Sequence, residues 1–164
     1  MQYLFGSRYC PVIAFSRLVD DEFPGTEGGA RVAAIRDFIG GRFTYLAGSS
    51  DSETDAMATF IQREGVCRDY AHVLISLARA SNIPARFASV YAPDVDPPDF
   101  HAVAEVFLAD GNGSGAWHPV DATGMAEAGE IARIGVGRDA ADVSFLTVFG
   151  VAEMIRQTVS VTRA

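Results

Sequence analysis

Apolar residues in the first half of the chain recur every three to four positions, which is the spacing of one helix face. This spacing predicts helices over residues 26–41, 56–61 and 66–80. The last of these has almost no polar face, so we expect it to be buried and central. Residues 1–25 show no such period, because Pro11, Pro24 and Gly25 interrupt it, and are expected to form an irregular lead-in.

β-branched and alternating apolar residues become frequent in the second half and predict strands. The expected strands cover residues 85–91, 100–108, 116–120, 143–149 and 155–161. The stretch 110–115, with the sequence DGNGSG, is rich in residues that tolerate positive φ and predicts a hairpin loop. Helices followed by strands indicate an α+β fold with an antiparallel sheet, in a single domain over residues 1–164.

The composition narrows the classes of function. The 164 residues are 49% hydrophobic and 21% charged, and the net charge is −8. An acidic chain without a cluster of Lys and Arg argues against nucleic acid and against an anionic membrane as partners. No apolar run approaches the roughly 18 residues of a membrane helix, and the first residues do not resemble a signal peptide. Two cysteines cannot form a disulfide framework, so we expect a cytoplasmic protein; its oligomeric state is not indicated.

One of the two cysteines stands at a position that favours chemistry. Cys67 follows Gly65 and Val66 in the first turn of the predicted central helix. Unpaired N–H groups and the helix dipole at this end favour a thiolate, and the same N–H groups can bind an oxyanion that forms on an acyl substrate. Cys10 has no such context and is expected in the core.

A base and a carboxylate are expected near the cysteine. His101 opens one strand of the predicted hairpin and Asp121 ends the other, so the two are expected to be neighbours without a fixed register. Cys67, His101 and Asp121 would then act as nucleophile, base and orienting group. His72 falls about 140° around the helix from Cys67 and is expected to be structural. His118 is expected on the surface of the hairpin or behind Asp121.

Three separated motifs resemble those of the bacterial transglutaminase-like superfamily. They read GVCRDYAHVLISLARASNIPARFASVYAP, FHAVAEVFL and WHPVDATG, in the family's order and with fitting gaps. The resemblance implies a papain-like transglutaminase core, in which a Cys-bearing helix packs on an antiparallel sheet that carries His and Asp. By this resemblance, Cys67 corresponds to the nucleophile, His101 to the base and Asp121 to the residue that orients the base. The stretch 137–143 also resembles the segment that follows the Asp motif.

This chain departs from the family pattern at two positions, and the resemblance also bears on domain organisation. The family often has Trp where this chain has Val103 and Pro where it has Ala122, and the first position bears on the shape of the substrate pocket. Longer relatives carry an N-terminal β-rich domain, and we expect this chain to be the core without it. Arg68, next to the nucleophile, and Tyr91 are candidates for the edge of the site.

The sequence therefore predicts thiol-dependent acyl transfer on an amide or peptide-like substrate, through an acyl-thioester and without metal or cofactor. Hydrolysis, as a protease or amidase, is favoured over transfer to an amine, because water is always available and no amine-binding feature is visible. Two alternatives stay open. The same three residues could hold zinc, although no close-spaced ligand pair is present. The chain could also be a catalytically silent scaffold that binds a peptide or protein partner.

Overall fold

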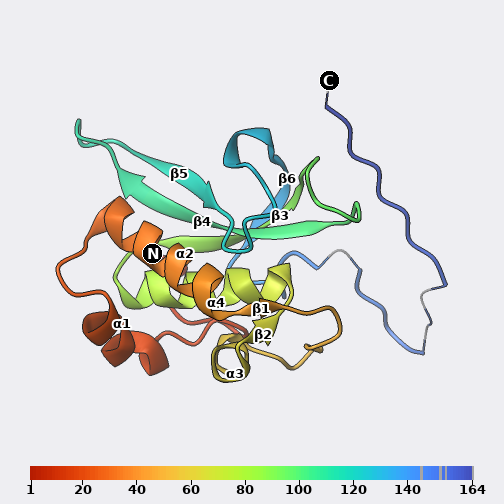
Figure 1. Ribbon diagram of the computed structural model, residues 1–164, viewed down its shortest axis with the longest axis horizontal. Helices are drawn as coiled ribbons and strands as arrows, with labels where there is room; N and C mark the ends of the chain where they lie inside the picture. The colour runs from red at the N-terminus through yellow and green to blue at the C-terminus, as the bar shows by residue number, and fades with distance from the viewer. Residues whose placement is uncertain (145, 152, 154, 164) are drawn as a thin grey trace.

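The computed structural model describes residues 1–144, 146–151, 153 and 155–163, in which helices cover one face of a four-stranded sheet (Figure 1). The α-helices of these residues are α1 (Ser16–Glu22), α2 (Gly28–Arg42), α3 (Ala56–Gln62) and α4 (Cys67–Ala80). The strands are β1 (Thr44–Tyr45), β2 (Glu64–Gly65), β3 (Ala85–Tyr91), β4 (His101–Ala109), β5 (Gly115–Val120) and β6 (Ala132–Gly137). Short 3-10 helices are η1 (Gln2–Leu4), η2 (Ile13–Phe15) and η3 (Ala128–Glu130).

The main sheet has the strand order β5-β4-β3-β6, and all of its neighbours are antiparallel. Ala88, in the middle of β3, pairs with Val103 of β4 on one side and with Val136 of β6 on the other. β1 and β2 form a separate parallel pair, and β2 directly precedes α4. This architecture confirms the predicted α+β class with an antiparallel sheet.

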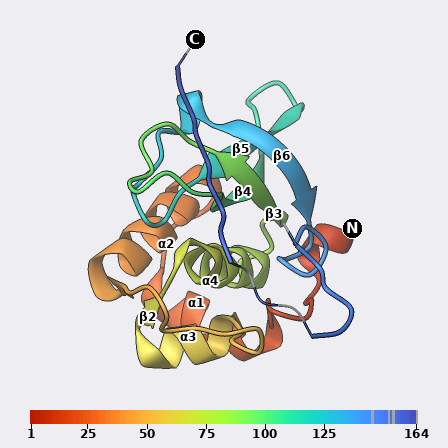
Figure 2. The ribbon, with the colours of Figure 1, turned by 90° about the vertical axis from the view of Figure 1, so that its right-hand side faces the viewer.

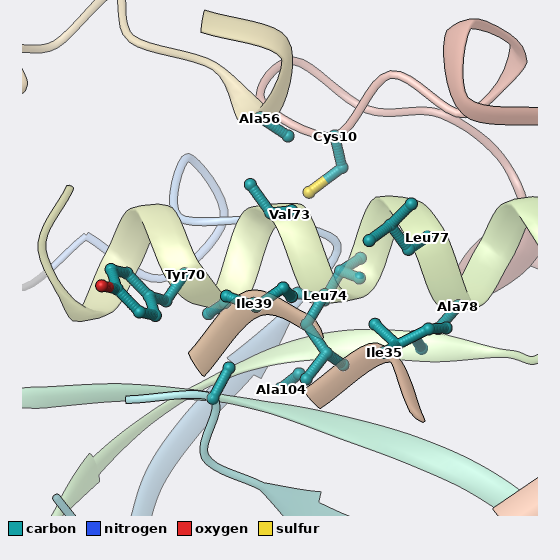
Figure 3. Close-up of a cluster of buried hydrophobic side chains, with 14 of the residues drawn as sticks. Cys10, Ile35, Ile39, Ala56, Tyr70, Val73, Leu74, Leu77, Ala78 and Ala104 are labelled. Atoms are coloured by element: carbon teal, nitrogen blue, oxygen red, sulfur yellow. The ribbon is translucent and has the colours of Figure 1, made fainter. Parts of the chain in front are cut away.

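α4 is the central element of the core. The sheet lies on one side of this helix, and α1 and α3 lie on the other (Figure 2). Leu74 points toward Ala104 of β4, and Ile35 and Ile39 of α2 close the same cluster (Figure 3). Each buried aliphatic side chain of this kind contributes about 1.5–3 kcal/mol to folding. The prediction of a helix buried nearly all round is confirmed, since every residue from Asp69 to Arg79 is buried.

Two elements differ from the sequence prediction because tertiary contacts form them. α1 lies in the lead-in that was expected to be irregular, and its Val19 packs into the main core at 1% exposure. β6 was not expected, because its sequence ARIGVG contains two glycines and weak alternation. Pairing with the free edge of β3 makes it a strand.

The predicted closing strand over residues 155–161 is wrong: this segment is irregular. β6 already occupies the edge of β3, and Ile155 is 94% exposed, so alternation there buries no apolar face. In Figure 1 the C-terminal segment runs apart from the sheet. The expected strand over 143–149 is likewise not formed at its described positions, and its residue 145 lies outside the described residues. Within the described part of the chain, no helix is long and apolar enough to span a membrane.

Candidate active site

The start of α4 is fixed by a close approach between a glycine and an aspartate. α4 begins at Cys67, after the extended residue Val66. A Cβ on Gly65 would lie 2.8 Å from the Asp69 Cβ, so only glycine fits there without displacing this side chain. The Asp69 carboxylate in turn accepts a hydrogen bond from the Val66 N–H at 2.9 Å. These contacts explain the spacing Gly-Val-Cys-x-Asp and hold Cys67 at the helix N-terminus.

His101 and Asp121 meet through the hairpin. The ladder between β4 and β5 pairs Ala104 with Val120, one residue before Asp121. Continued by one step, it sets Asp121 opposite Val103, two residues from His101. The His101 Nε2 nonetheless lies 2.9 Å from the Asp121 Oδ2. The two residues are therefore neighbours, as expected, although they are not directly opposite each other.

Asp121 is held as an anion in a nearly closed site. Its side chain is 4% exposed. It accepts hydrogen bonds from the Thr123 N–H at 2.8 Å, the Thr123 hydroxyl at 2.7 Å and the Ala126 N–H at 2.9 Å. Burial alone raises the pKa of Asp121, but the bonds with His101 and Thr123 outweigh burial and lower it. Because an ionised carboxylate only accepts, Nε2 of His101 is the donor of their hydrogen bond.

His101 links the carboxylate to the cysteine. Its side chain hydrogen-bonds Asp121 and also Cys67. Since Nε2 faces Asp121, Nδ1 is the nitrogen left for the thiol. Burial lowers the pKa of His101, but the bonds with Asp121 and Cys67 more than offset burial and raise the pKa to about 9. The imidazole therefore carries a proton at neutral pH.

A cavity of about 800 Å³ opens beside Cys67 and His101. The apolar side chains in its wall include those of Phe87, Phe100, Ile134, Val143 and Leu146. The polar side chains in its wall include those of Ser50, Ser52, Arg68, Asp99 and Gln157. A mostly apolar cleft with a few polar groups is the usual form of a site that binds an organic ligand.

The two candidates for the edge of the site, Arg68 and Tyr91, and the third histidine, His118, lie in different places. Arg68 lines the cavity, and its guanidinium is held by the Asp69 carboxylate at 3.0 Å and the Asp51 carbonyl at 2.8 Å. Tyr91 is not among the lining residues, but its ring packs on Phe100, which is, at 5.5 Å between centroids. His118 is exposed on β5, opposite Val106, and is not brought to the cavity.

The two positions that depart from the family pattern also lie away from the cavity wall. Val103 is 1% exposed and packs with Ala88 and Val90 in a small cluster apart from the main core. Ala122 is 5% exposed and belongs to the main core. Neither lines the cavity, so the expected effect of Val103 on the pocket would have to act indirectly.

Sequence reasoning assigned no role to Tyr45, which the structure brings to the nucleophile. The Tyr45 phenol hydrogen-bonds both the backbone and the side chain of Cys67. In the sequence Tyr45 lies between the predicted helices over 26–41 and 56–61, and this place gives no sign of its partner. Among the described residues, no group of three His, Cys, Asp or Glu side chains is arranged to hold a metal ion.

Comparison with known proteins places this geometry in a family. The model of the transglutaminase-like superfamily matches residues 19–122. A crystal structure of a Cytophaga hutchinsonii protein described as a "putative cysteine protease" is 41% identical, with a TM-score of 0.84, over 91% of this chain and 50% of that chain. The periplasmic domain of TgpA from Pseudomonas aeruginosa has the same fold at 24% identity and a TM-score of 0.57, over 74% of this chain and 45% of that chain.

An uncharacterised protein of Mycobacterium tuberculosis is 33% identical over 112 residues, which are 62% of this chain and 35% of that protein. The match thus spans about a third of the curated relative and half of the Cytophaga chain. The match of the family model extends from α1 to the end of the hairpin and includes Cys67, His101 and Asp121. This chain belongs to the transglutaminase-like superfamily.

Proposed function

We propose that this domain catalyses acyl transfer from an amide or peptide-like substrate through a thioester on Cys67. The observation that carries the proposal is the continuous contact from Cys67 to His101 and on to Asp121, at the helix N-terminus and beside a cavity. The sequence alone predicted the same three roles. Likeness to a cysteine protease candidate supports thiol chemistry in general.

The charges of the site suit an ion pair as the reactive state. His101 is protonated at neutral pH, with Nε2–H bound to Asp121 and Nδ1–H directed at the sulfur. This cation and the N–H groups of the first turn of α4 both stabilise negative charge on the Cys67 sulfur during the reaction. Asp121 holds the imidazole in this orientation and stabilises its charge, without taking the proton.

The reaction then follows from this geometry. The Cys67 sulfur attacks the carbonyl carbon, and the carbonyl electron pair moves to oxygen. When the tetrahedral intermediate collapses, the carbon–nitrogen bond breaks and His101 gives its proton to the leaving nitrogen. The neutral imidazole next takes a proton from water or from an amine, which attacks the thioester and releases Cys67.

We propose hydrolysis, of the protease or amidase type, as the main outcome. The cavity wall is largely apolar, with the rings of Phe87 and Phe100 and the side chains of Ile134 and Leu146, which suits a peptide side chain. Water is always available, whereas an amine needs a site of its own that holds it near the thioester. Both cysteines are free thiols, which supports the expected cytoplasmic setting.

Alkylation by iodoacetamide tests the ion pair without knowledge of the substrate. The rate at Cys67 is measured from about pH 4 to about pH 9 in the wild type and in His101→Ala, with a free-cysteine peptide as reference. We expect fast alkylation at pH 6 that falls at least about tenfold in the variant. A rate equal to that of the peptide and unchanged by the substitution would refute the proposal and favour the scaffold alternative.

Dimethylated casein, with and without cadaverine, separates hydrolysis from transfer. Mass spectrometry reads out new peptide termini, conversion of glutamine to glutamate, and cadaverine joined to glutamine. We expect products of hydrolysis that Cys67→Ala does not form. Cadaverine adducts in excess of hydrolysis would assign the domain to amine transfer instead, with the same nucleophile.

A further inference from the structure

A carboxylate lies in the wall of the cavity, close in sequence to His101. Asp99 lines the cavity together with Cys67 and stands two residues before His101. The ring of the intervening Phe100 packs on Tyr91, the last residue of β3, with centroids 5.5 Å apart. The end of the β3–β4 loop that carries Asp99 is therefore anchored on the sheet, next to the strand that carries the base.

Arg68 and His101, which are cations in the same wall, are each paired with a carboxylate. The Arg68 guanidinium lies 3.0 Å from the carboxylate of Asp69, which is fully buried. His101 lies 2.9 Å from the carboxylate of Asp121. Each pair offsets its own charge, so neither cation neutralises Asp99.

Asp99 meets only neutral donors in the described part of the chain. Its Oδ1 accepts hydrogen bonds from the Phe100 N–H at 2.7 Å and from the side-chain amide of Gln157, which also lines the cavity. None of the ion pairs among the described residues includes Asp99. Its negative charge is therefore left for a group that enters the cavity.

The charge of Asp99 acts close to the nucleophile. Burial is the first cause that raises the pKa of the Tyr45 phenol to about 12, and the charges of Cys67 and Asp99 add to this rise. The same phenol hydrogen-bonds Cys67. A group bound by Asp99 would therefore lie near the acyl group that Cys67 carries.

The surroundings of Asp99 suit a long side chain with a charged end. Lys and Arg side chains combine an apolar stem with a cation. The cavity wall offers the rings of Phe87 and Phe100 to the stem and the carboxylate of Asp99 to the cation.

We propose that Asp99 is a specificity-determining residue, which binds the cationic side chain of a lysine or arginine in the acyl part of a peptide substrate. This role rests on the proposed function of Cys67. In the free protein the Gln157 amide occupies the carboxylate. The cation of the substrate replaces this amide, because two opposite charges attract each other more strongly than a carboxylate and a neutral amide do. An anionic side chain at the same place would be repelled.

The same contacts allow a merely structural role, in which Asp99 only holds Gln157. Two substitutions separate the roles. Asp99→Asn keeps an acceptor oxygen for the Gln157 amide and removes the charge, whereas Gln157→Ala removes the amide and keeps the charge. Selection of a cation depends on the charge, and a structural role depends on the bond.

The experiment measures acylation of Cys67 by the p-nitrophenyl esters of Nα-benzyloxycarbonyl-lysine, -norleucine and -glutamate. The proteins are the wild type, Asp99→Asn, Asp99→Lys, Gln157→Ala and Asp94→Asn. Asp94→Asn is the matched control, because Asp94 lies in the same loop but contacts Arg163 at 2.7 Å and is not among the residues that line the cavity. Release of p-nitrophenolate gives each second-order rate constant, with Cys67→Ala subtracted as background. Each constant is divided by that of a free-cysteine peptide, which removes differences in ester reactivity.

We expect the wild type to react about 10-fold to 100-fold faster with the lysine ester than with the glutamate ester, and less selectively at about 0.5 M salt. Asp99→Asn should lower this ratio at least about fivefold and leave the norleucine rate within about twofold of the wild type. Asp99→Lys should reverse the preference. Asp94→Asn should keep the ratio within about twofold, and Gln157→Ala should keep or raise it.

Three results would overturn the assignment of Asp99. They are an unchanged ratio in Asp99→Asn, an equal fall in Asp94→Asn, and a loss of preference in Gln157→Ala that matches Asp99→Asn. Failure of the proposed function looks different, because the wild type and all variants would then react with the three esters no faster than the free-cysteine peptide.

Discussion

Two sets of cysteine, histidine and aspartate lie around α4, and they differ in almost every property. The first set is Cys67, His101 and Asp121 at the N-terminus of the helix. The second set is Cys10, His72 and Asp139 along its buried side. Cys10 points at α4 near Val73 and Ala56 (Figure 3), and it is 0% exposed.

The second set is a buried, largely neutral packing unit. His72 stacks on Tyr9 at 5.1 Å between ring centroids, and its Nε2 accepts from the Ala140 N–H at 3.2 Å. Burial lowers the pKa of His72 to about 4. Burial likewise raises the pKa of Cys10 to about 12. Asp139 accepts hydrogen bonds from the Tyr9 N–H at 3.0 Å and the Ala141 N–H at 2.9 Å.

The difference shows that place, and not residue type, decides which set can react. In the first set the imidazole bonds to an ionised carboxylate and to a thiol that borders a cavity, so separated charges are stabilised. In the second set the imidazole bonds to a backbone N–H, and burial keeps both the ring and the thiol neutral.

The largest expected difference lies between the two thiols. Cys67→Ala should lower acylation by p-nitrophenyl acetate by ~10⁴-fold or more, because the nucleophile is lost. Cys10→Ala should leave the rate within about twofold and lower the free energy of unfolding by roughly 1–2 kcal/mol, because a buried sulfur is removed. Rates and urea unfolding of both variants measure this. A Cys10→Ala variant that folds but has lost acylation would contradict the assignment.

The two thiols should also differ in labelling of the native protein. Iodoacetamide should modify Cys67 at least about 100-fold faster than Cys10, which is reachable only when the core opens. Peptide mapping by mass spectrometry after timed labelling gives both rates. Addition of urea should bring the two rates together, and comparable rates without urea would show that Cys10 is not protected as the structure requires.

Loss of the Asp121 carboxylate should appear in the reaction kinetics, whereas loss of the Asp139 carboxylate should appear in the stability of the fold. Asp121→Ala should lower acylation by about 100-fold or more, because His101 loses its orienting partner. Asp139→Ala should lower the free energy of unfolding by about 1–3 kcal/mol, because the buried N–H of Tyr9 and the partly buried N–H of Ala141 lose their acceptor. The rate of Cys67 alkylation in Asp139→Ala should stay within about threefold of the wild-type rate. If Asp139→Ala instead matched Asp121→Ala in kinetics, the two sets would not be separate.

The last expected difference is in pH dependence, and it has opposite signs in the two sets. NMR should show His101 titrating near pH 9 and His72 near pH 4. The raised pKa of His101 stabilises the fold fully below about pH 6.5, and this contribution is lost as pH rises toward 9. The lowered pKa of His72 stabilises the fold above about pH 6.5, and this contribution is lost as pH falls toward 4.

Unfolding by urea across this pH range checks the linkage, with His101→Ala and His72→Phe as variants. His101→Ala should remove the fall in the free energy of unfolding above about pH 6.5, and His72→Phe should remove the fall below about pH 6.5. Each variant should leave the other pH dependence unchanged. Titration of both histidines near pH 6.5 would contradict the environments that the structure gives them.

The sequence by itself determined the elements whose signals are local. The apolar spacing of α4 runs almost unbroken over 14 residues, so its burial could be predicted. Its first residue is marked by Gly65 and Asp69, which meet within one turn. The hairpin is marked by its loop, which placed His101 and Asp121 at neighbouring strand ends. Cys67, His101 and Asp121 could therefore be brought together from the order and spacing of three motifs.

Only the tertiary structure decided the features that depend on partners distant along the chain. β6 became a strand because the edge of β3 was free, while the better alternating segment 155–161 found no edge. Tyr45 reached Cys67 through a two-residue ladder that has no sequence signature. His72 and His101 are the same side chain in sequence, yet burial beside a backbone N–H keeps one neutral, and a buried carboxylate keeps the other charged. Local periodicity sets which face of an element is apolar, but packing sets which charges it can hold.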